Sequence, residues 1–156
     1  MNIVLYQPEI PPNTGNIIRL CANTGSQLHL IEPMGFSLNE KSCRRAGLDY
    51  HALTYVHKYK DWDTFLSEHP KAHFVALTTK AQQQYQTHAF SSDAFLLFGP
   101  ETRGLPESIL HDKAVTPIRV PMAPDSRSLN LSNTVSIVLY EALRQHNFQV
   151  GKILLQ

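Results

Sequence analysis

Short aliphatic runs alternate with helical patterns along this chain, and that alternation restricts its fold more than any other feature of the sequence. Residues 2–6 form a run suited to a strand that is covered on both faces. The three prolines that follow cannot lie in a helix interior, so we predict that Asn13 or Thr14 caps the next helix. Gly25 is placed to end that helix, and residues 28–31 are again typical of a strand. The amino-terminal segment therefore predicts a βαβ unit.

The alternation continues toward the carboxyl terminus. Apolar runs predict further strands at residues 52–56, 73–78, 94–98 and 118–120. Helical patterns predict helices near residues 39–46, 61–68 and 129–145. The last of these helices has a core face of apolar residues at helical spacing, namely Val135, Val138, Leu139, Ala142 and Leu143. Because nearly uninterrupted apolar strands belong in a buried parallel sheet and no Gly-, Ser- or Pro-rich linker divides the chain, we predict one α/β domain, residues 1–156, with a mostly parallel sheet flanked by helices.

Length and charge exclude several classes of protein. A chain of 156 residues can bury about two-thirds of the surface that it exposes when unfolded, so it needs neither a disulfide nor a structural metal to fold. No apolar stretch approaches the ~20 residues that cross a bilayer, and the amino terminus lacks the pattern of a signal peptide. We therefore expect no membrane partner and a cytoplasmic location. The net charge is +1, so an RNA partner requires a local basic patch rather than a polycationic chain.

The cysteines and histidines do not predict a metal site. Cys21 and Cys43 are isolated in the sequence, and reduced, partly buried thiols are their simplest interpretation. His69 and His73 have the spacing of two ligands on one helical face, but Pro70 lies between them and a strand-like run follows. We therefore predict that the chain binds no metal.

Three polar segments interrupt the apolar pattern, each just after a predicted strand: residues 13–19, 98–104 and 121–133. Ligands of parallel sheets bind at the carboxyl ends of the strands, so each segment is a candidate for a binding site. A helix cap with a solvated arginine explains the first segment equally well, and a plain turn explains the glycines of the second. The third places seven small polar or charged side chains around a helix start, which is more than a cap requires. All three lack the glycine fingerprints of dinucleotide-binding and P-loop proteins.

In order and in spacing, these segments resemble the three motifs of the SPOUT-class RNA ribose 2'-O-methyltransferases. The matching residues are Asn13-Thr14-Gly15-Asn16-Ile17-Ile18-Arg19, Phe98-Gly99-Pro100-Glu101-Thr102-Arg103-Gly104 and residues 118–133. The resemblance covers the whole chain and, since it shows no additional RNA-binding domain, extends to the small bacterial members that methylate the wobble nucleotide of tRNA. It implies a deep trefoil knot in the carboxyl-terminal third, a homodimer, and S-adenosylmethionine as methyl donor, with S-adenosylhomocysteine as product.

The resemblance also implies the substrate and the roles of individual residues. The substrate is the tRNA anticodon stem-loop, in which the wobble ribose, of a cytidine or modified uridine, is methylated in selected tRNAs, among them leucine isoacceptors. Arg19 assists the attack of the ribose 2'-hydroxyl, and because a guanidinium stays protonated in proteins, we favour stabilisation of the developing alkoxide over a neutral arginine base. Arg127 and Tyr140 handle the target nucleotide, although a tyrosine half-buried at a helix interface is an alternative for Tyr140. The implied cofactor pocket consists of Leu77, Thr78, Gly99, Glu101, Gly104, Ile118, Val120, Met122, Ser128, Leu129 and Asn133.

A further set of residues is expected to bind RNA, comprising Asn13, Arg19, Lys41, Arg44, Arg45, Arg103 and Arg127. The densest basic cluster of this set lies at residues 41–45, where a solvated helix face is the simpler explanation without the motifs. Two other functions stay open. One is a non-catalytic RNA- or nucleotide-binding module on the same fold, although the intact third motif argues against a lost activity. The other is a dinucleotide enzyme, which would need a glycine fingerprint after the first strand.

Overall fold

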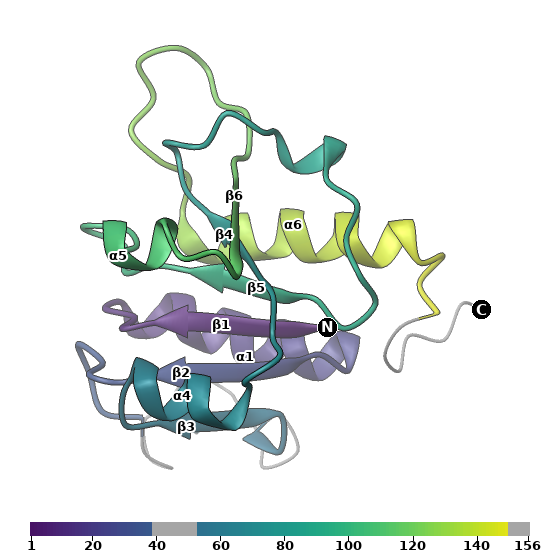
Figure 1. Cartoon of the computed structure of the whole chain (residues 1–156). Helices are drawn as coiled ribbons and strands as arrows, with labels where there is room; N and C mark the ends of the chain where they lie inside the picture. The colour runs from purple at the N-terminus through teal and green to yellow at the C-terminus, as the bar shows by residue number, and fades with distance from the viewer. Residues whose placement is uncertain (39–52, 150–156) are drawn as a thin grey trace.

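A six-stranded parallel sheet lies at the centre of the computed structural model, which describes residues 1–38 and 53–149 (Figure 1). The strands are β1 (Asn2–Tyr6), β2 (Gln27–Ile31), β3 (Val56–Tyr59), β4 (Phe74–Leu77), β5 (Phe95–Phe98) and β6 (Val115–Ile118). The helices are α1 (Pro11–Thr24), α4 (Trp62–Glu68), the single turn η1 (Tyr85–Thr87), α5 (Glu107–Leu110) and α6 (Leu131–Gln145). In the order β3-β2-β1-β5-β4-β6, each strand is parallel to its neighbours. The predicted α/β fold with a parallel sheet flanked by helices is confirmed.

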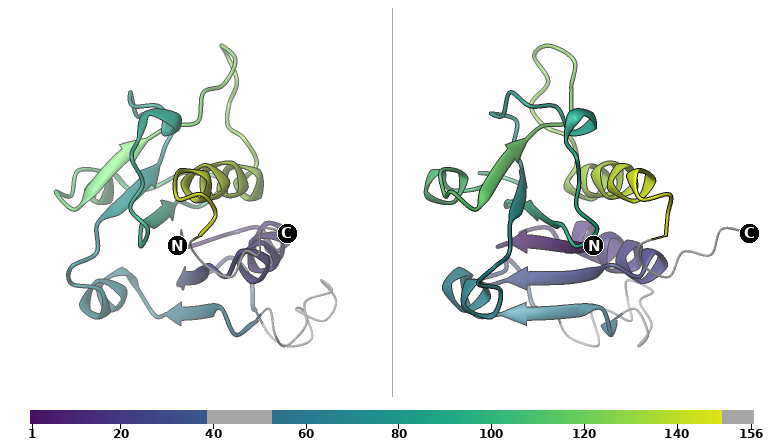
Figure 2. Two further views of the ribbon diagram at one scale, coloured as in Figure 1. Left: turned by 90° about the vertical axis from the view of Figure 1, so that its right-hand side faces the viewer. Right: turned by 45° about the vertical axis from the view of Figure 1, so that its right-hand side comes forward.

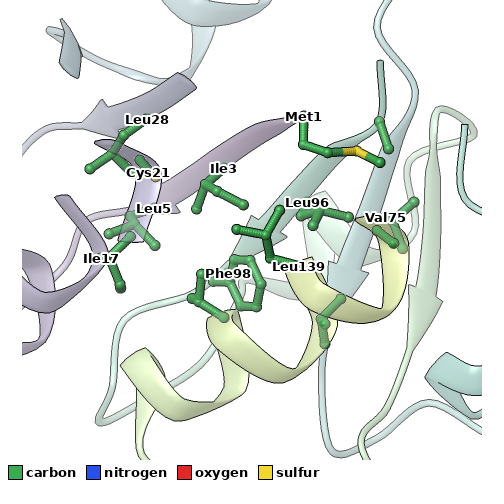
Figure 3. Packing of buried hydrophobic residues seen from close by; sticks show 14 of the residues in the cluster. Met1, Ile3, Leu5, Ile17, Cys21, Leu28, Val75, Leu96, Phe98 and Leu139 are labelled. Carbon is green, nitrogen blue, oxygen red and sulfur yellow. The ribbon is translucent and has the colours of Figure 1, made fainter. Parts of the chain in front are cut away.

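Helices cover both faces of the sheet. Figure 2 shows α1 and α6 on one side of the sheet and α4 and α5 on the other. The alternation of side chains along β1 explains this arrangement, because Ile3 and Leu5 belong to the cluster that includes α1 and α6, whereas Val4 packs in the cluster under α4 and α5. Figure 3 shows Ile17 of α1 and Leu139 of α6 among the side chains of the first cluster. The central strands are therefore buried on both faces, as their apolar sequences predicted.

Helix α6 is the predicted carboxyl-terminal helix, and its core face is confirmed. The five apolar residues predicted to form that face are all buried, namely Val135, Val138, Leu139, Ala142 and Leu143. The helix begins at Leu131, with the Asn130 side chain as its cap, rather than at residue 129. Cys21 is a buried free thiol on α1, and burial raises its pKa to about 12.

The prolines before α1 act differently from the prediction. Helix α1 begins at Pro11, so Pro11 and Pro12 occupy its first turn and Ile10 is the cap residue. Proline fits there because the first amides of a helix have no intrahelical acceptor. The prediction that Asn13 or Thr14 caps this helix was therefore wrong. Gly25 does end α1, with a φ of 67° in the left-handed region and its N–H bonded to the Cys21 carbonyl.

Two predicted strands are displaced along the sequence. Strand β3 begins at Val56, where the predicted strand at 52–56 ends, and β6 covers Val115–Ile118 rather than 118–120. Pro117 lies within β6, and it is tolerated because β6 is an edge strand with one set of amides unpaired. The short elements α5 and η1 were not predicted, and the predicted helix at 39–46 falls outside the described residues. Across residues 1–38 and 53–149, no helix combines the length and the apolar character that a bilayer crossing requires.

The order of the strands creates a topological switch point between β1 and β5. These strands are neighbours, but β1 leads into α1 on one face and β5 leads toward α5 on the opposite face (Figure 2). The loops that leave their carboxyl ends therefore diverge. In open parallel sheets, ligands bind at such a switch point.

Candidate active site

A cleft of about 640 Å³ lies at the carboxyl ends of β4, β5 and β6. One wall is formed by residues 77–80 after β4 and another by residues 98–105 after β5. The loop between β6 and α6 contributes residues 120, 122 and 127–131, and Ile10 and Asn13 enter from the segment after β1. Parts of the three polar segments that the sequence singled out therefore meet at this cleft.

Most of the residues expected to bind the cofactor line this cleft. They are Leu77, Thr78, Gly99, Glu101, Gly104, Val120, Met122, Ser128 and Leu129. Ile118 lies instead in the core beneath the cleft, where it is fully buried. Asn133 is exposed on the first turn of α6, and its backbone N–H donates to Asn130 Oδ1 over 3.3 Å. Asn130 itself, which was not predicted, does line the cleft.

The two glycines of the loop after β5 are required for different reasons. A Cβ on Gly99 would lie 2.4 Å from the Leu105 nitrogen and 2.5 Å from the Gly104 carbonyl carbon, so the loop folds back too closely for any side chain there. Gly104 has a φ of 70°, in the left-handed region, and a Cβ on it would meet nothing within 4 Å. Gly99 therefore permits the chain to approach itself, whereas Gly104 permits the turn.

Glu101 connects this loop to the start of α1. Its carboxylate accepts hydrogen bonds from the Glu9 amide (2.9 Å), the Ile10 amide (3.2 Å) and Asn13 Nδ2 (3.1 Å). Asn13 Oδ1 in turn accepts a hydrogen bond from Asn130 Nδ2 over 2.9 Å. The segment after β1, the loop after β5 and the start of α6 are thus joined by one polar network.

Glu9 makes the reciprocal contact. Its carboxylate accepts hydrogen bonds from the Thr102 amide (3.0 Å) and hydroxyl (2.8 Å), and it pairs with Arg103 Nη1 over 2.6 Å. Arg103 Nη2 also donates to Gln7 Oε1 over 2.7 Å. The hydrogen bonds from Thr102, followed by the charge of Arg103, hold the pKa of Glu9 below its usual value. The carboxylate is therefore ionised at neutral pH.

The predicted catalytic residues lie at different places. Arg127 lines the cleft, whereas Arg19 is exposed on α1 and does not line it. Tyr140 is 47% exposed on α6, with its ring centroid 6.4 Å from that of Phe148. A single chain therefore brings only Arg127 of these three to the cleft.

The residues expected to bind RNA are also divided. Asn13, Arg103 and Arg127 line the cleft, with Asn13 and Arg103 held in the polar networks described above. Lys41, Arg44 and Arg45 lie outside the described residues.

Sequence reasoning missed several residues of the site. Glu9 and Gln7 were not predicted, because their partners Thr102 and Arg103 are far away in the sequence and give no local signal. Lys80 also lines the cleft and forms an ion pair with Glu107 of α5. Within the described ranges, no group of three or more His, Cys, Asp or Glu side chains is arranged to hold a metal ion.

Comparisons with known proteins give relatives along nearly the whole chain. The chain is 58% identical to the tRNA (cytidine(34)-2'-O)-methyltransferase of Escherichia coli K12 over 146 residues, which cover 93% of each protein. It is 53% identical to the enzyme of the same name from Methylovorus glucosotrophus over 150 residues, 94% of this chain and 96% of the relative.

Solved structures show the same similarity. A structure concerned with the 2-OH methylation of C/U34 on tRNA has a TM-score of 0.86 and 39% identity, and the match covers 94% of this chain and 95% of that one. The SpoU methyltransferase AviRb from Streptomyces viridochromogenes, in complex with the cofactor AdoMet, shares the fold, with a TM-score of 0.78 and 24% identity over 94% of this chain and 58% of that one. Residues 1–140 match the model of the SpoU rRNA Methylase family, and the chain belongs to that family.

Proposed function

We propose that this chain is an S-adenosylmethionine-dependent methyltransferase that methylates the ribose 2'-hydroxyl of nucleotide 34 in tRNA. The observation that carries the proposal is the cleft on which parts of the three motif segments converge, in a chain 58% identical to a tRNA (cytidine(34)-2'-O)-methyltransferase. The substrate nucleotide is a cytidine or a modified uridine. We extend the proposal to leucine isoacceptors and to a cytoplasmic location, as the resemblance of the motifs implies.

The cleft fits S-adenosylmethionine in size and in chemistry. Its volume of about 640 Å³ lies within the range of small-molecule sites. Val120, Met122 and Leu129 offer apolar contacts for a nucleoside, and the loop after β5 offers backbone groups. The carboxyl-terminal third, which carries the loop before α6, is where we expect the trefoil knot.

The chemistry requires alignment and the loss of one proton. S-adenosylmethionine supplies a methyl group that its sulfonium already activates, so the protein needs no metal for this transfer. The residues of the chain orient the ribose oxygen in line with the methyl group and stabilise the charge that develops on that oxygen. A protonated arginine suits the second task, and we assign it to Arg19. Arg127 and Tyr140 would hold the target nucleotide.

The position of Arg19 favours a site shared between two subunits. Arg19 does not line the cleft of its own chain, so it can act there only if a second copy presents it. A homodimer also supplies two basic surfaces to one tRNA, which compensates for a chain of net charge +1. We therefore propose that the active form is a homodimer in which Arg19 of one subunit serves the cleft of the other.

Two measurements on the purified chain test the function. Calorimetry should detect binding of S-adenosylhomocysteine, and incubation with tRNA and S-adenosylmethionine should transfer methyl groups. Binding without transfer to any tRNA would instead support a non-catalytic module. Absence of both would overturn the proposal.

A further inference from the structure

The loops after β1 and β5 hold each other through two carboxylates. Glu101 accepts hydrogen bonds from the amides of Glu9 and Ile10, and Glu9 accepts hydrogen bonds from the amide and hydroxyl of Thr102. Glu9 and Thr102 are 93 positions apart in the sequence, so their contact does not result from local chain geometry. The exchange fixes the spacing of two segments at the switch point of the sheet.

Arg103, in the loop after β5, adds a further contact to the segment after β1. Its guanidinium bridges Glu9 Oε1 (2.6 Å) and Gln7 Oε1 (2.7 Å), and such a two-armed contact requires the planar fork of arginine. Gln7 has a φ of 50°, in the region that non-glycine residues rarely adopt. A strained backbone conformation often marks a functional residue, and here it presents the Gln7 side chain to Arg103.

The loop that these contacts hold has little other support. Thr102, Arg103 and Gly104 are exposed, and the buried apolar residues of the loop are at its two ends, Pro100 and Leu105. A segment with so few apolar contacts opens at low cost, and a ligand that needs it closed must supply the ordering free energy. The loop also lines the cleft.

We propose that Glu9 and Arg103 are positioning residues that hold the loop after β5 in the conformation that binds the cofactor. This inference rests on the proposed function of the cleft. Glu9 does not touch the cleft itself, and Arg103 acts through its pairing with Glu9 and Gln7 rather than through a phosphate of the RNA. Disrupting the pair therefore weakens cofactor binding and spares the binding of tRNA.

The test compares Glu9→Gln and Arg103→Ala with the wild-type chain. Each variant should bind S-adenosylhomocysteine about tenfold more weakly and raise the KM for S-adenosylmethionine similarly, because residues of one network couple by such factors. The double variant should bind no more weakly than the worse single one. At saturating cofactor, kcat and the KM for tRNA should change by less than about twofold, which a general loss of structure would not allow.

Glu141→Gln is the matched control. Glu141 pairs with Arg144 over 2.7 Å, and the exposed fractions of this pair, 13% and 64%, are close to those of Glu9 and Arg103, 21% and 55%. It lies on α6 and does not line the cleft, so its loss should leave cofactor affinity unchanged. Circular dichroism verifies that each variant folds. If Glu9→Gln does not fold, Arg103→Ala alone tests the inference.

The outcomes separate the inference from the function on which it rests. Wild-type affinity for S-adenosylhomocysteine in folded Glu9→Gln or Arg103→Ala would overturn the inference alone. So would tighter tRNA binding in Glu9→Gln together with weaker binding in Arg103→Ala, since that pattern identifies a phosphate contact. A wild-type chain that binds no S-adenosylhomocysteine would overturn both.

Discussion

Asn13 of α1 and Asn130 at the start of α6 are joined directly, because Asn130 Nδ2 donates a hydrogen bond to Asn13 Oδ1 over 2.9 Å. The two residues are 117 positions apart in the sequence. Since Asn13 also donates to Glu101, the three segments that line the cleft share one network. The helix that carries Arg19 is thereby tied to both segments proposed to bind the cofactor.

Two substitutions of Asn130 separate its roles. Asn130→Ala removes the cap of α6 and the link to Asn13, and it should lower the free energy of unfolding by about 1–2 kcal/mol. Asn130→Asp keeps an acceptor for the Asn133 amide but places an oxygen against Asn13 Oδ1, so it should restore the cap and not the link. Urea denaturation measures the difference. Equal stability of Asn130→Ala and the wild type would contradict this account.

Gly99 should tolerate no side chain. In Gly99→Ala the Cβ would lie within 2.5 Å of the neighbouring backbone, so the loop must shift and the affinity for S-adenosylhomocysteine should fall by at least about tenfold. Gly104→Asn is the comparison, because asparagine tolerates a positive φ and the space there is open. Calorimetry should find its affinity much closer to that of the wild type. Similar losses in both variants would show that the reasons given for the two glycines are incorrect.

His29 should make the fold sensitive to acid. Its ring lies 5.3 Å from that of His57 and 5.2 Å from that of His69, and burial, with the charges of these two histidines, lowers the pKa of His29 from 6.5 to about 3. Between these values the unfolded chain binds a proton that the folded chain excludes, so the free energy of unfolding falls as the pH is lowered. The contribution is up to about 1.4 kcal/mol per pH unit.

Urea denaturation across this pH window checks the sign and the size of the effect. His29→Gln should flatten the dependence, whereas His111→Gln, at an exposed position, should leave it as in the wild type. An unchanged slope in His29→Gln would exclude this histidine as the source.

Arg19→Ala should separate chemistry from cofactor binding. Because Arg19 does not line the cleft of its own chain, the variant should bind S-adenosylhomocysteine normally and lose methyl transfer by roughly two or more orders of magnitude. Heterodimers of an Arg19→Ala subunit with a Gly99→Val subunit should regain activity, since one intact composite site is rebuilt. Differential tagging verifies that such heterodimers form. Verified heterodimers without activity would refute the shared site.

The spacing of apolar residues and glycines was sufficient to predict those parts of the fold in which the local sequence pattern agrees with the packing. The core face of α6 and the end of α1 at Gly25 followed from spacing and from the conformational freedom of glycine. The start of β6 was not predicted because Pro117 lies within it, and a proline argues against a central strand. The sequence does not reveal that β6 is an edge strand, where a proline is tolerated. The prolines predicted a later start of α1, although the first turn of the helix accommodates Pro11 and Pro12.

The candidate site was predictable only in part. Its segments were visible as polar interruptions after strands, and their ligand chemistry came from the resemblance. The contacts of Glu9 with Thr102 and of Asn130 with Asn13 join residues far apart in the sequence, so no local pattern reveals them. A cap was the reasonable interpretation of Asn13, yet the early start of α1 releases its side chain for Glu101.

Mass-spectrometric mapping of the methylated ribose identifies the nucleotide that the chain modifies. The purified wild-type chain should transfer one methyl group from S-adenosylmethionine to the 2'-oxygen of nucleotide 34 in a substrate tRNA. The same tRNA prepared with a 2'-O-methyl group already at that nucleotide should accept none. Methylation at another nucleotide, or equal transfer to the blocked tRNA, would contradict the proposed function.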